Sequence, residues 1–227
     1  MSNAWFLLSS GPGKPAENMA VDDVLLSRAS ETGRPVLRFY GWTEPAATFG
    51  YSQPFARIAA WTPLRPLIRR PTGGGLVPHD FDWTYSVVVP PDHEWYQLSA
   101  TESYQRAHEW LRRAFAHAGL VTELAPCCNP AGPGQCFIGA EKHDLLLGIR
   151  KLAGAAQRRN RQGLLIQGSI QPPPAGLDRQ RWESAMTAIG YGPPCHFESW
   201  TLPESYQHAA ADLAAHRYAT TAYNERR

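Results

Sequence analysis

The stretch Arg69-Arg-Pro-Thr-Gly-Gly-Gly-Leu-Val-Pro-His-Asp80 is the most distinctive segment of this 227-residue chain. Three consecutive glycines permit positive φ angles and let a ligand approach the backbone closely. Their N–H groups can line a narrow slot or bind an anion, and the two preceding arginines can hold a carboxylate or a phosphate. The segment is not a P-loop, because no Gly-Lys-Ser/Thr follows. Taken alone, it fits a ligand-binding loop and a flexible hairpin tip equally well.

A second segment, Gly148-Ile-Arg-Lys151-Leu-Ala-Gly154-Ala-Ala-Gln157, places a lysine on an expected strand beside small residues. Such a lysine can point into a slot, where its ammonium can hold a carbonyl oxygen, a thiolate or a phosphate. An isolated lysine is far more often an ordinary exposed residue. The lysine therefore gains meaning only together with the rest of the sequence.

Together the two segments resemble the biotinyl/lipoyl protein ligase and octanoyltransferase superfamily, in its lipoate–protein ligase and Cys-dependent octanoyltransferase branch. The first resembles the signature Arg-Arg-x-x-Gly-Gly-Gly-x-Val-x-His-Asp, with matches at Arg69, Arg70, Gly73, Gly74, Gly75, Val77, His79 and Asp80. The second resembles the motif Gly-x-Lys-x-x-Gly-x-Ala/Gln, with matches at Lys151, Gly154 and Ala156. Further matches follow in the same order, at Asn18-Met-Ala-x-Asp22, Arg38-Phe-Tyr-Gly-Trp42, Gly50-x-x-Gln53 and Gln167-Gly-Ser-Ile170.

The resemblance runs from about residue 5 to residue 170 and implies a fold and a pocket. The fold would be α+β, a mixed β-sheet with packed helices like the biotin/lipoate ligase catalytic domain. Residues 1–227 would form a single catalytic domain without a C-terminal accessory domain. The glycine loop would line the tunnel for an acyl chain, with its polar residues near the reacting carboxyl group. The resemblance gives Lys151 a catalytic role and places Gly154 and Ala156 in the substrate pocket.

The superfamily runs two chemistries, and a cysteine distinguishes them. Transferases move octanoyl from acyl carrier protein through a cysteine thioester and need no cofactor, whereas ligases use ATP and Mg²⁺ to form lipoyl-AMP. Gln135-Cys136-Phe137 stands where those transferases carry the nucleophile, fifteen residues before Lys151. A nearby ammonium raises the thiolate fraction of a thiol. We therefore expect Cys136 to be the nucleophile, although Ile138–Leu145 departs from the transferase pattern and looks as much like a ligase.

Three functions remain open at this point. The first is octanoyl or lipoyl transfer from acyl carrier protein to a lysine of a lipoyl domain, such as the glycine cleavage H protein or a 2-oxoacid dehydrogenase E2. The second is an ATP-dependent lipoate–protein ligase. The third is a non-catalytic homologue that binds an acyl chain or a carrier, which an intact Lys151 and glycine loop argue against.

Composition excludes several other classes. The net charge of +2 is too small to indicate a nucleic-acid partner. No apolar stretch approaches the roughly 20 residues that span a bilayer, and no signal peptide is evident. We therefore expect a cytoplasmic protein with reduced thiols and no membrane partner. The spacing of Cys127, Cys128 and Cys136 is not that of zinc ligands, so we expect no metal site.

Periodicity and turn residues indicate the elements of an α+β domain. Helices are expected at Pro15–Ala29, Ser99–Ala118, Trp182–Ile189 and Glu204–Ala219, with capping boxes at Ser99–Glu102 and Thr201–Glu204. Strands are expected at Trp5–Leu8, Val36–Trp42, Ala47–Tyr51, Leu67–Arg70, Thr84–Val89, Asp144–Leu147, Lys151–Ala156 and Leu164–Ile170. Val36–Trp42 and Ala47–Tyr51 are expected to be two strands joined by a turn.

Overall fold

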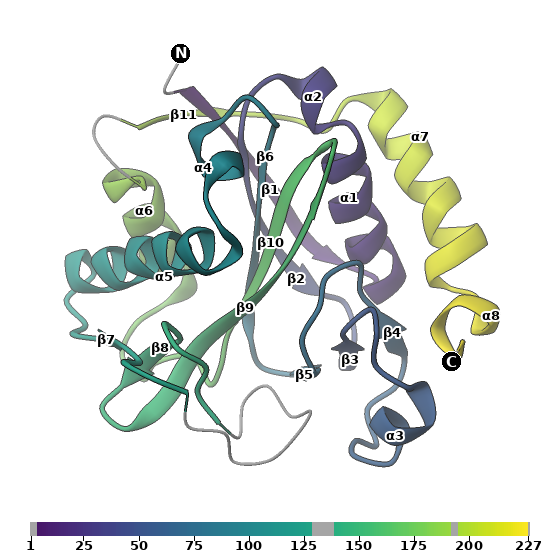
Figure 1. The fold of residues 1–227 in the computed structure, drawn as a ribbon, viewed down its shortest axis with the longest axis horizontal. Coiled ribbons are helices and arrows are strands. Elements are labelled where there is room, and N and C mark those ends of the chain that lie inside the picture. Colours follow the sequence, from purple (N-terminus) through teal and green to yellow (C-terminus); the bar gives the residue numbers. More distant parts are fainter. Residues whose placement is uncertain (1–3, 129–138, 192–194, 227) are drawn as a thin grey trace.

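The computed structural model describes residues 4–128, 139–191 and 195–226, which form an α+β fold around a mixed sheet (Figure 1). The larger sheet has the order β11-β1-β2-β6-β10-β9-β8-β7. Its strands are β1 (Ala4–Gly13), β2 (Val36–Trp42), β6 (Trp83–Val89), β7 (Glu123–Leu124), β8 (Leu145–Leu147), β9 (Arg150–Asn160), β10 (Gly163–Ile170) and β11 (His196–Ser199). Only the pairs of β1 with β2 and with β11 are parallel in the described sheet. The expected α+β class is confirmed.

A smaller sheet, in the order β4-β3-β5, lies beside the larger one (Figure 1). Its strands are β3 (Ala46–Phe49), β4 (Leu67–Arg69) and β5 (Leu76–His79). The two strands expected at Val36–Trp42 and Ala47–Tyr51 are present as β2 and β3, joined by the short connection at residues 43–45, which carries the chain from the large sheet to the small one. β5 was not expected, because its four residues include Pro78, and a proline argues against assigning a short segment as a strand. The glycine loop therefore connects two strands of the small sheet.

Helices cover both faces of the large sheet (Figure 1). They are α1 (Pro15–Ser27), α2 (Ala29–Thr32), α3 (Phe55–Ala59), α4 (Glu94–Gln97), α5 (Ala100–His117), α6 (Arg179–Ile189), α7 (Glu204–Leu213), a π-helical turn at Ala214–Tyr218, and α8 (Thr221–Asn224). One core packs α5 and α6 against the sheet, and a second packs α1 and α7 against the opposite face. None of the described helices is long and apolar enough to cross a membrane.

Side chains along the central strands point alternately to the two faces of the sheet, and this alternation explains the two cores. On β2, Leu37 and Phe39 face the first core, whereas Val36 and Tyr40 face the second. Successive strand residues point to opposite faces, so a strand covered by helices on both faces is mostly apolar. The strand reading of Val36–Trp42 from its β-branched and aromatic residues is therefore confirmed to the residue.

The two expected capping boxes have different outcomes. Ser99 caps α5 as expected: its hydroxyl accepts from the Glu102 N–H at 3.2 Å, and the Glu102 carboxylate accepts from the Ser99 N–H at 2.9 Å. The Thr201 box is wrong, because the N-cap of α7 is Pro203, which has no side-chain acceptor. Thr201 lies two residues before the N-cap, too early to reach the first free N–H groups of the helix.

Candidate active site

The glycine loop is anchored on both sides. The Tyr51 N–H donates to the Thr72 carbonyl at 2.8 Å, and the Arg70 guanidinium donates to the Gly73 carbonyl at 2.5 and 3.1 Å. Gly74 adopts a φ of +84°, a conformation that favours glycine. A Cβ on Gly50 would lie 1.9 Å from the Gly74 carbonyl oxygen, so position 50, which packs against the loop, must also be glycine. The loop is therefore a braced structure and not a free hairpin tip.

Arg69 braces the same region from within the protein. Its guanidinium donates to the carbonyls of Tyr51 and Gln53 and to three carbonyls near the C-terminal end, those of Tyr223, Asn224 and Arg226. These bonds use all five guanidinium N–H groups. The expected contact of Arg69 with a substrate anion would require one of them to break, so the structure places Arg69 as a clamp between α8 and the loop after β3.

His79 is buried at the end of β5 and belongs to a polar cluster. Its Nδ1 is 2.8 Å from the Asp82 carboxylate, its Nε2 is 2.8 Å from the Thr48 hydroxyl, and its ring stacks on Trp42. Burial opposes ionisation of Asp82, but His79 and hydroxyl donors outweigh burial and hold its pKa below the usual range. The motif residue Asp80 is exposed. The partner of His79 is thus Asp82, which lies outside the family signature, and not Asp80.

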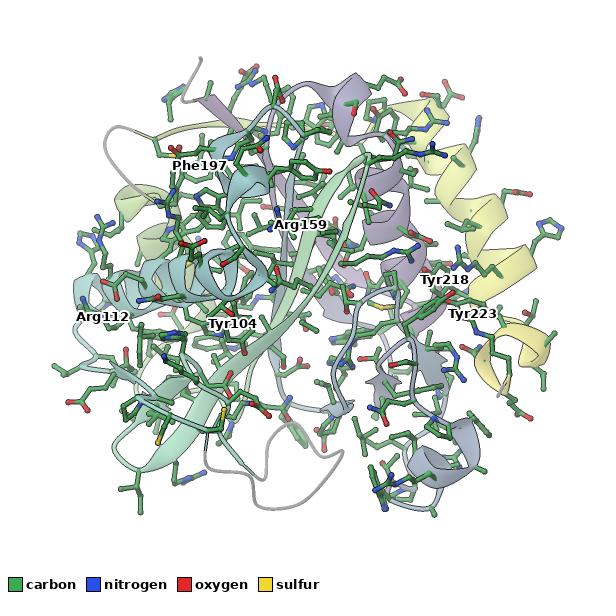
Figure 2. All side chains as sticks on the ribbon, in the orientation of Figure 1. Tyr104, Arg112, Arg159, Phe197, Tyr218 and Tyr223 are labelled. Atoms are coloured by element: carbon green, nitrogen blue, oxygen red, sulfur yellow. The ribbon has the colours of Figure 1, made fainter. Side chains whose placement is uncertain are left out.

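Lys151 is held in place by a buried carboxylate. Its Nζ lies 2.7 Å from the Asp144 Oδ2, and both side chains are almost fully buried. The Glu141 N–H donates to the same carboxylate at 2.6 Å, and the Tyr104 hydroxyl donates to its other oxygen. The Ala155 N–H in turn donates to the Tyr104 oxygen at 3.2 Å. Tyr104, which Figure 2 labels near the start of α5, thereby ties the carboxylate to the strand that carries the lysine.

Gly154 creates the space for this arrangement. A Cβ at this position would lie 2.7 Å from the Lys151 Cε, 2.8 Å from its Nζ and 3.2 Å from the Asp144 Oδ1. The lysine side chain therefore crosses directly over the glycine. This contact gives a physical reason for a Lys-x-x-Gly spacing on one strand, because any larger residue would push the ammonium away from its carboxylate.

Comparison of this chain with known proteins identifies its family. The sequence model of the lipoyl protein ligase A/B catalytic domain matches residues 14–171. The chain belongs to this family. It is also 34% identical over 180 residues to the octanoyltransferase LipM of Bacillus subtilis, a match that covers 73% of this chain and 64% of that relative. The chain thus spans somewhat less than two thirds of the length of that relative.

Solved structures agree on the fold of this lipoyl ligase family member. A lipoate–protein ligase A bound with ATP superposes with a TM-score of 0.76 at 20% identity, covering 99% of each chain. A bi-partite lipoate protein ligase from Thermoplasma acidophilum gives a TM-score of 0.72 at 19% identity, covering 99% of this chain and 96% of that one. At these identities the likeness concerns the fold, and it confirms the expected catalytic-domain architecture.

The N-terminal motifs of the family member meet in one buried network. Asp22 on α1 accepts from Arg38 at 2.7 Å, from Ser86 at 2.8 Å and from the Gln167 amide at 2.7 Å. Gln167 also accepts from the Thr72 hydroxyl, at 2.7 Å. The glycine loop is therefore tied to α1 through β10. These motifs, although far apart in the sequence, together build one support for the loop.

A buried histidine completes the surroundings of Lys151. His108 packs against the Tyr104 ring, and its Nδ1 lies 3.1 Å from the Tyr104 carbonyl, which can only accept, so Nδ1 carries the proton. Burial lowers the pKa of His108 to about 4 and keeps the ring neutral. The lysine site thus contains a neutral imidazole, a carboxylate, a phenol and an ammonium, of which only the ammonium belongs to a family motif.

The other predicted site residues and the cysteines differ in how deeply they are buried. Gly75 is buried, Val77 and Ala156 are half-buried on β5 and β9, and Cys136 lies outside the described residues. Cys127 and Cys128 are exposed, whereas burial raises the pKa of the Cys195 thiol to about 11 and makes it unreactive. Within residues 4–128, 139–191 and 195–226, no group of three His, Cys, Asp or Glu side chains is placed to hold a metal ion.

Proposed function

We propose that this protein transfers an octanoyl or lipoyl group from acyl carrier protein to a lysine of a lipoyl domain through a thioester on Cys136. The family and the 34% identity to an octanoyltransferase support this function. The observation that carries it is the ammonium of Lys151, which Asp144 and Gly154 hold in one position. The acceptor would be a lipoyl-domain protein such as the glycine cleavage H protein or a 2-oxoacid dehydrogenase E2.

The reaction would proceed in two transfers. The Cys136 thiolate attacks the carbonyl carbon of the carrier thioester, a new C–S bond forms, and the carrier leaves as its thiolate, which takes up a proton. The acceptor lysine, as a neutral amine, then attacks the acyl-enzyme. A C–N bond forms, the C–S bond to Cys136 breaks, and the amine proton leaves as the cysteine thiolate is regenerated. No cofactor enters this balance.

Lys151 would act on the carbonyl oxygen in both transfers. Negative charge develops on that oxygen as either nucleophile adds, and a fixed cation in a water-poor site stabilises it strongly. The ion pair with Asp144 would keep the ammonium oriented between the two steps. The braced residues Gly73, Gly74 and Gly75, with Arg70, Val77, His79 and Ala156, would line the acyl chain's pocket.

Mass spectrometry after incubation with octanoyl–acyl carrier protein tests this proposal. The adduct should appear on the peptide that contains Cys136 and should be absent from the Cys136→Ala variant. That variant should also lose transfer to a lipoyl domain, while its melting temperature stays unchanged. Full turnover of Cys136→Ala without any adduct would eliminate the thioester route.

The second candidate is an ATP-dependent lipoate–protein ligase, because the matching family model includes ligases and an ATP-bound ligase shares the fold. In that reaction Lys151 would contact the α-phosphate and the acyl carboxyl oxygen, and Mg²⁺ would accompany ATP. Lipoate-dependent release of pyrophosphate from ATP is its signature. Inactivity with both donors alongside tight binding to a lipoyl domain would instead indicate a non-catalytic homologue.

A further inference from the structure

Two arginines converge on one exposed tyrosine beside the glycine loop. The guanidinium carbon of Arg226 lies 4.3 Å from the ring centre of Tyr51, and that of Arg158 lies 5.6 Å from it. Tyr51 keeps 42% of its surface exposed. We refer to Tyr51, Arg158 and Arg226 as the arginine–tyrosine cluster.

The cluster is fixed to the glycine loop and to the C-terminal helix. Arg158 donates to the Pro71 carbonyl at 3.5 Å, and Tyr51 donates its N–H to the Thr72 carbonyl at 2.8 Å. The Arg226 carbonyl is held by the buried Arg69 at 2.7 Å. Figure 1 shows α8 beside β4, on the side of the molecule that carries the small sheet. The cluster therefore has a defined position next to the expected acyl pocket.

Among the described residues, no neighbouring carboxylate balances its positive charge. In the part of the chain that the structure describes, neither Arg158 nor Arg226 forms an ion pair, and Asp23 is paired with Arg217. Arg226 lowers the pKa of the Tyr51 phenol most strongly, with smaller contributions from Arg158 and Arg217. Converging guanidinium groups repel each other, and a bound anion would relieve that repulsion.

Building on the function proposed above, we propose that the arginine–tyrosine cluster docks the anionic groups of the acyl carrier that delivers the octanoyl chain. Arginine is the side chain best suited to hold phosphate and carboxylate oxygens at a surface. The Tyr51 ring, which both guanidinium groups contact, helps to keep them in place through cation–π contacts. The anion can be the phosphate of the carrier's prosthetic arm or acidic side chains of the carrier itself.

The position of the cluster selects a long donor over a small one. Arg158 and Lys151 lie on the same strand, seven residues apart, which is roughly 23 Å between their Cα atoms. An acyl phosphate places its anion within a few bonds of the acyl carbonyl and cannot reach both positions. A carrier with a long arm places its thioester and its anionic groups far apart, so it can reach Lys151 and the cluster together.

Reversing the charge at Arg158 and measuring the kinetics with two acyl donors tests whether the carrier docks on the cluster. The Arg158→Glu variant should raise the KM for octanoyl–acyl carrier protein roughly tenfold, because an attraction becomes a repulsion. Its rate with octanoyl-N-acetylcysteamine, a short uncharged thioester, should equal that of the wild type. The exposed Arg161 on the turn after β9 is the matched control, and Arg161→Glu should change neither value. Arg158→Lys should recover most of the affinity.

Measurements on the wild type add a check that does not depend on a substituted residue. Its KM for the carrier should rise with ionic strength, while its KM for the uncharged thioester stays flat. An unchanged carrier KM in Arg158→Glu, an equal loss with both donors, or a rise only in the KM of the lipoyl-domain acceptor would each overturn the docking proposal.

Direct titration separates this inference from the proposed function. Holo-carrier should bind the wild type and bind Arg158→Glu at least about fivefold more weakly, whether or not any acyl group is transferred. If apo-carrier binds as tightly as holo-carrier, the anions are carrier side chains, and if only holo-carrier binds, they are the arm phosphate. Absence of acyl transfer from either donor would refute the proposed function, whereas equal carrier binding by both proteins would refute the docking surface alone.

Discussion

Replacing Gly154 with alanine tests the lysine site by adding one methyl group. The new Cβ would lie 2.7 Å from the Lys151 Cε and 2.8 Å from its Nζ, well inside van der Waals contact. The lysine side chain is the flexible partner, so it would move and the strand would stay. The ammonium would then leave its position 2.7 Å from the Asp144 carboxylate.

The size of the effect follows from Coulomb's law. With an effective dielectric constant of about 20, moving the pair from 2.7 Å to roughly 4 Å costs about 2 kcal/mol. That energy corresponds to about a 30-fold loss of the productive arrangement. A displacement of roughly 1 Å in a catalytic group can itself cost about 100-fold in rate. We therefore expect kcat for octanoyl transfer to fall by about 30- to 100-fold in Gly154→Ala.

The assay is transfer of octanoyl from the carrier to a lipoyl domain, followed by mass spectrometry of the acceptor. Gly41→Ala on β2 is the matched control, because its added Cβ would come no closer than 3.4 Å to any neighbour, the end of the Arg179 side chain. Circular dichroism melting should show that both variants fold. Wild-type kcat in a folded Gly154→Ala variant would refute the claim that a fixed Lys151 is essential.

Three further changes test the surrounding structure. Burial lowers the pKa of His108 from 6.5 to about 4, so only the unfolded chain gains this proton as pH falls between those values. Stability should drop by about 3 kcal/mol across that window, and urea denaturation should show that His108→Phe flattens the drop. Asp82→Asn should cost about 3 to 5 kcal/mol in the same assay because it breaks a buried pair, whereas the exposed Asp80→Asn should change stability by less than about 0.5 kcal/mol. Arg69→Lys should cost roughly 3 kcal/mol and speed hydrogen exchange in α8, and unchanged exchange there would show that the clamp is unnecessary.

Regular elements were predictable because local pattern decides them. The helix after Ser99 carries its own capping signal, and the runs at Val36–Trp42 and Leu164–Ile170 have the mostly apolar character of strands covered on both faces. The short strand β5 and the separation of β2 from β3 were not predictable in this way. Both depend on which distant segments pair, and the local pattern of apolar and polar residues does not specify that pairing.

The family motifs were visible in the sequence, but their physical partnerships were not. Tyr104 lies on the helix expected at Ser99–Ala118, but nothing in the sequence shows that its hydroxyl reaches the carboxylate that holds Lys151. Asp144 stands seven residues before that lysine, and only the pairing of β8 with β9 brings the two together. Likewise, Arg69 looked available for a ligand because a sequence does not show which carbonyls a buried guanidinium will meet.

The central claim is that the acyl group passes through a covalent enzyme intermediate. The direct measurement is intact-protein and peptide mass spectrometry after mixing the wild type with octanoyl–acyl carrier protein, without ATP and without an acceptor. The account predicts one octanoyl group on Cys136, which disappears when an apo lipoyl domain is added and reappears on the lysine of that domain. Transfer that proceeds only with ATP, with Cys136 unmodified throughout, would contradict it.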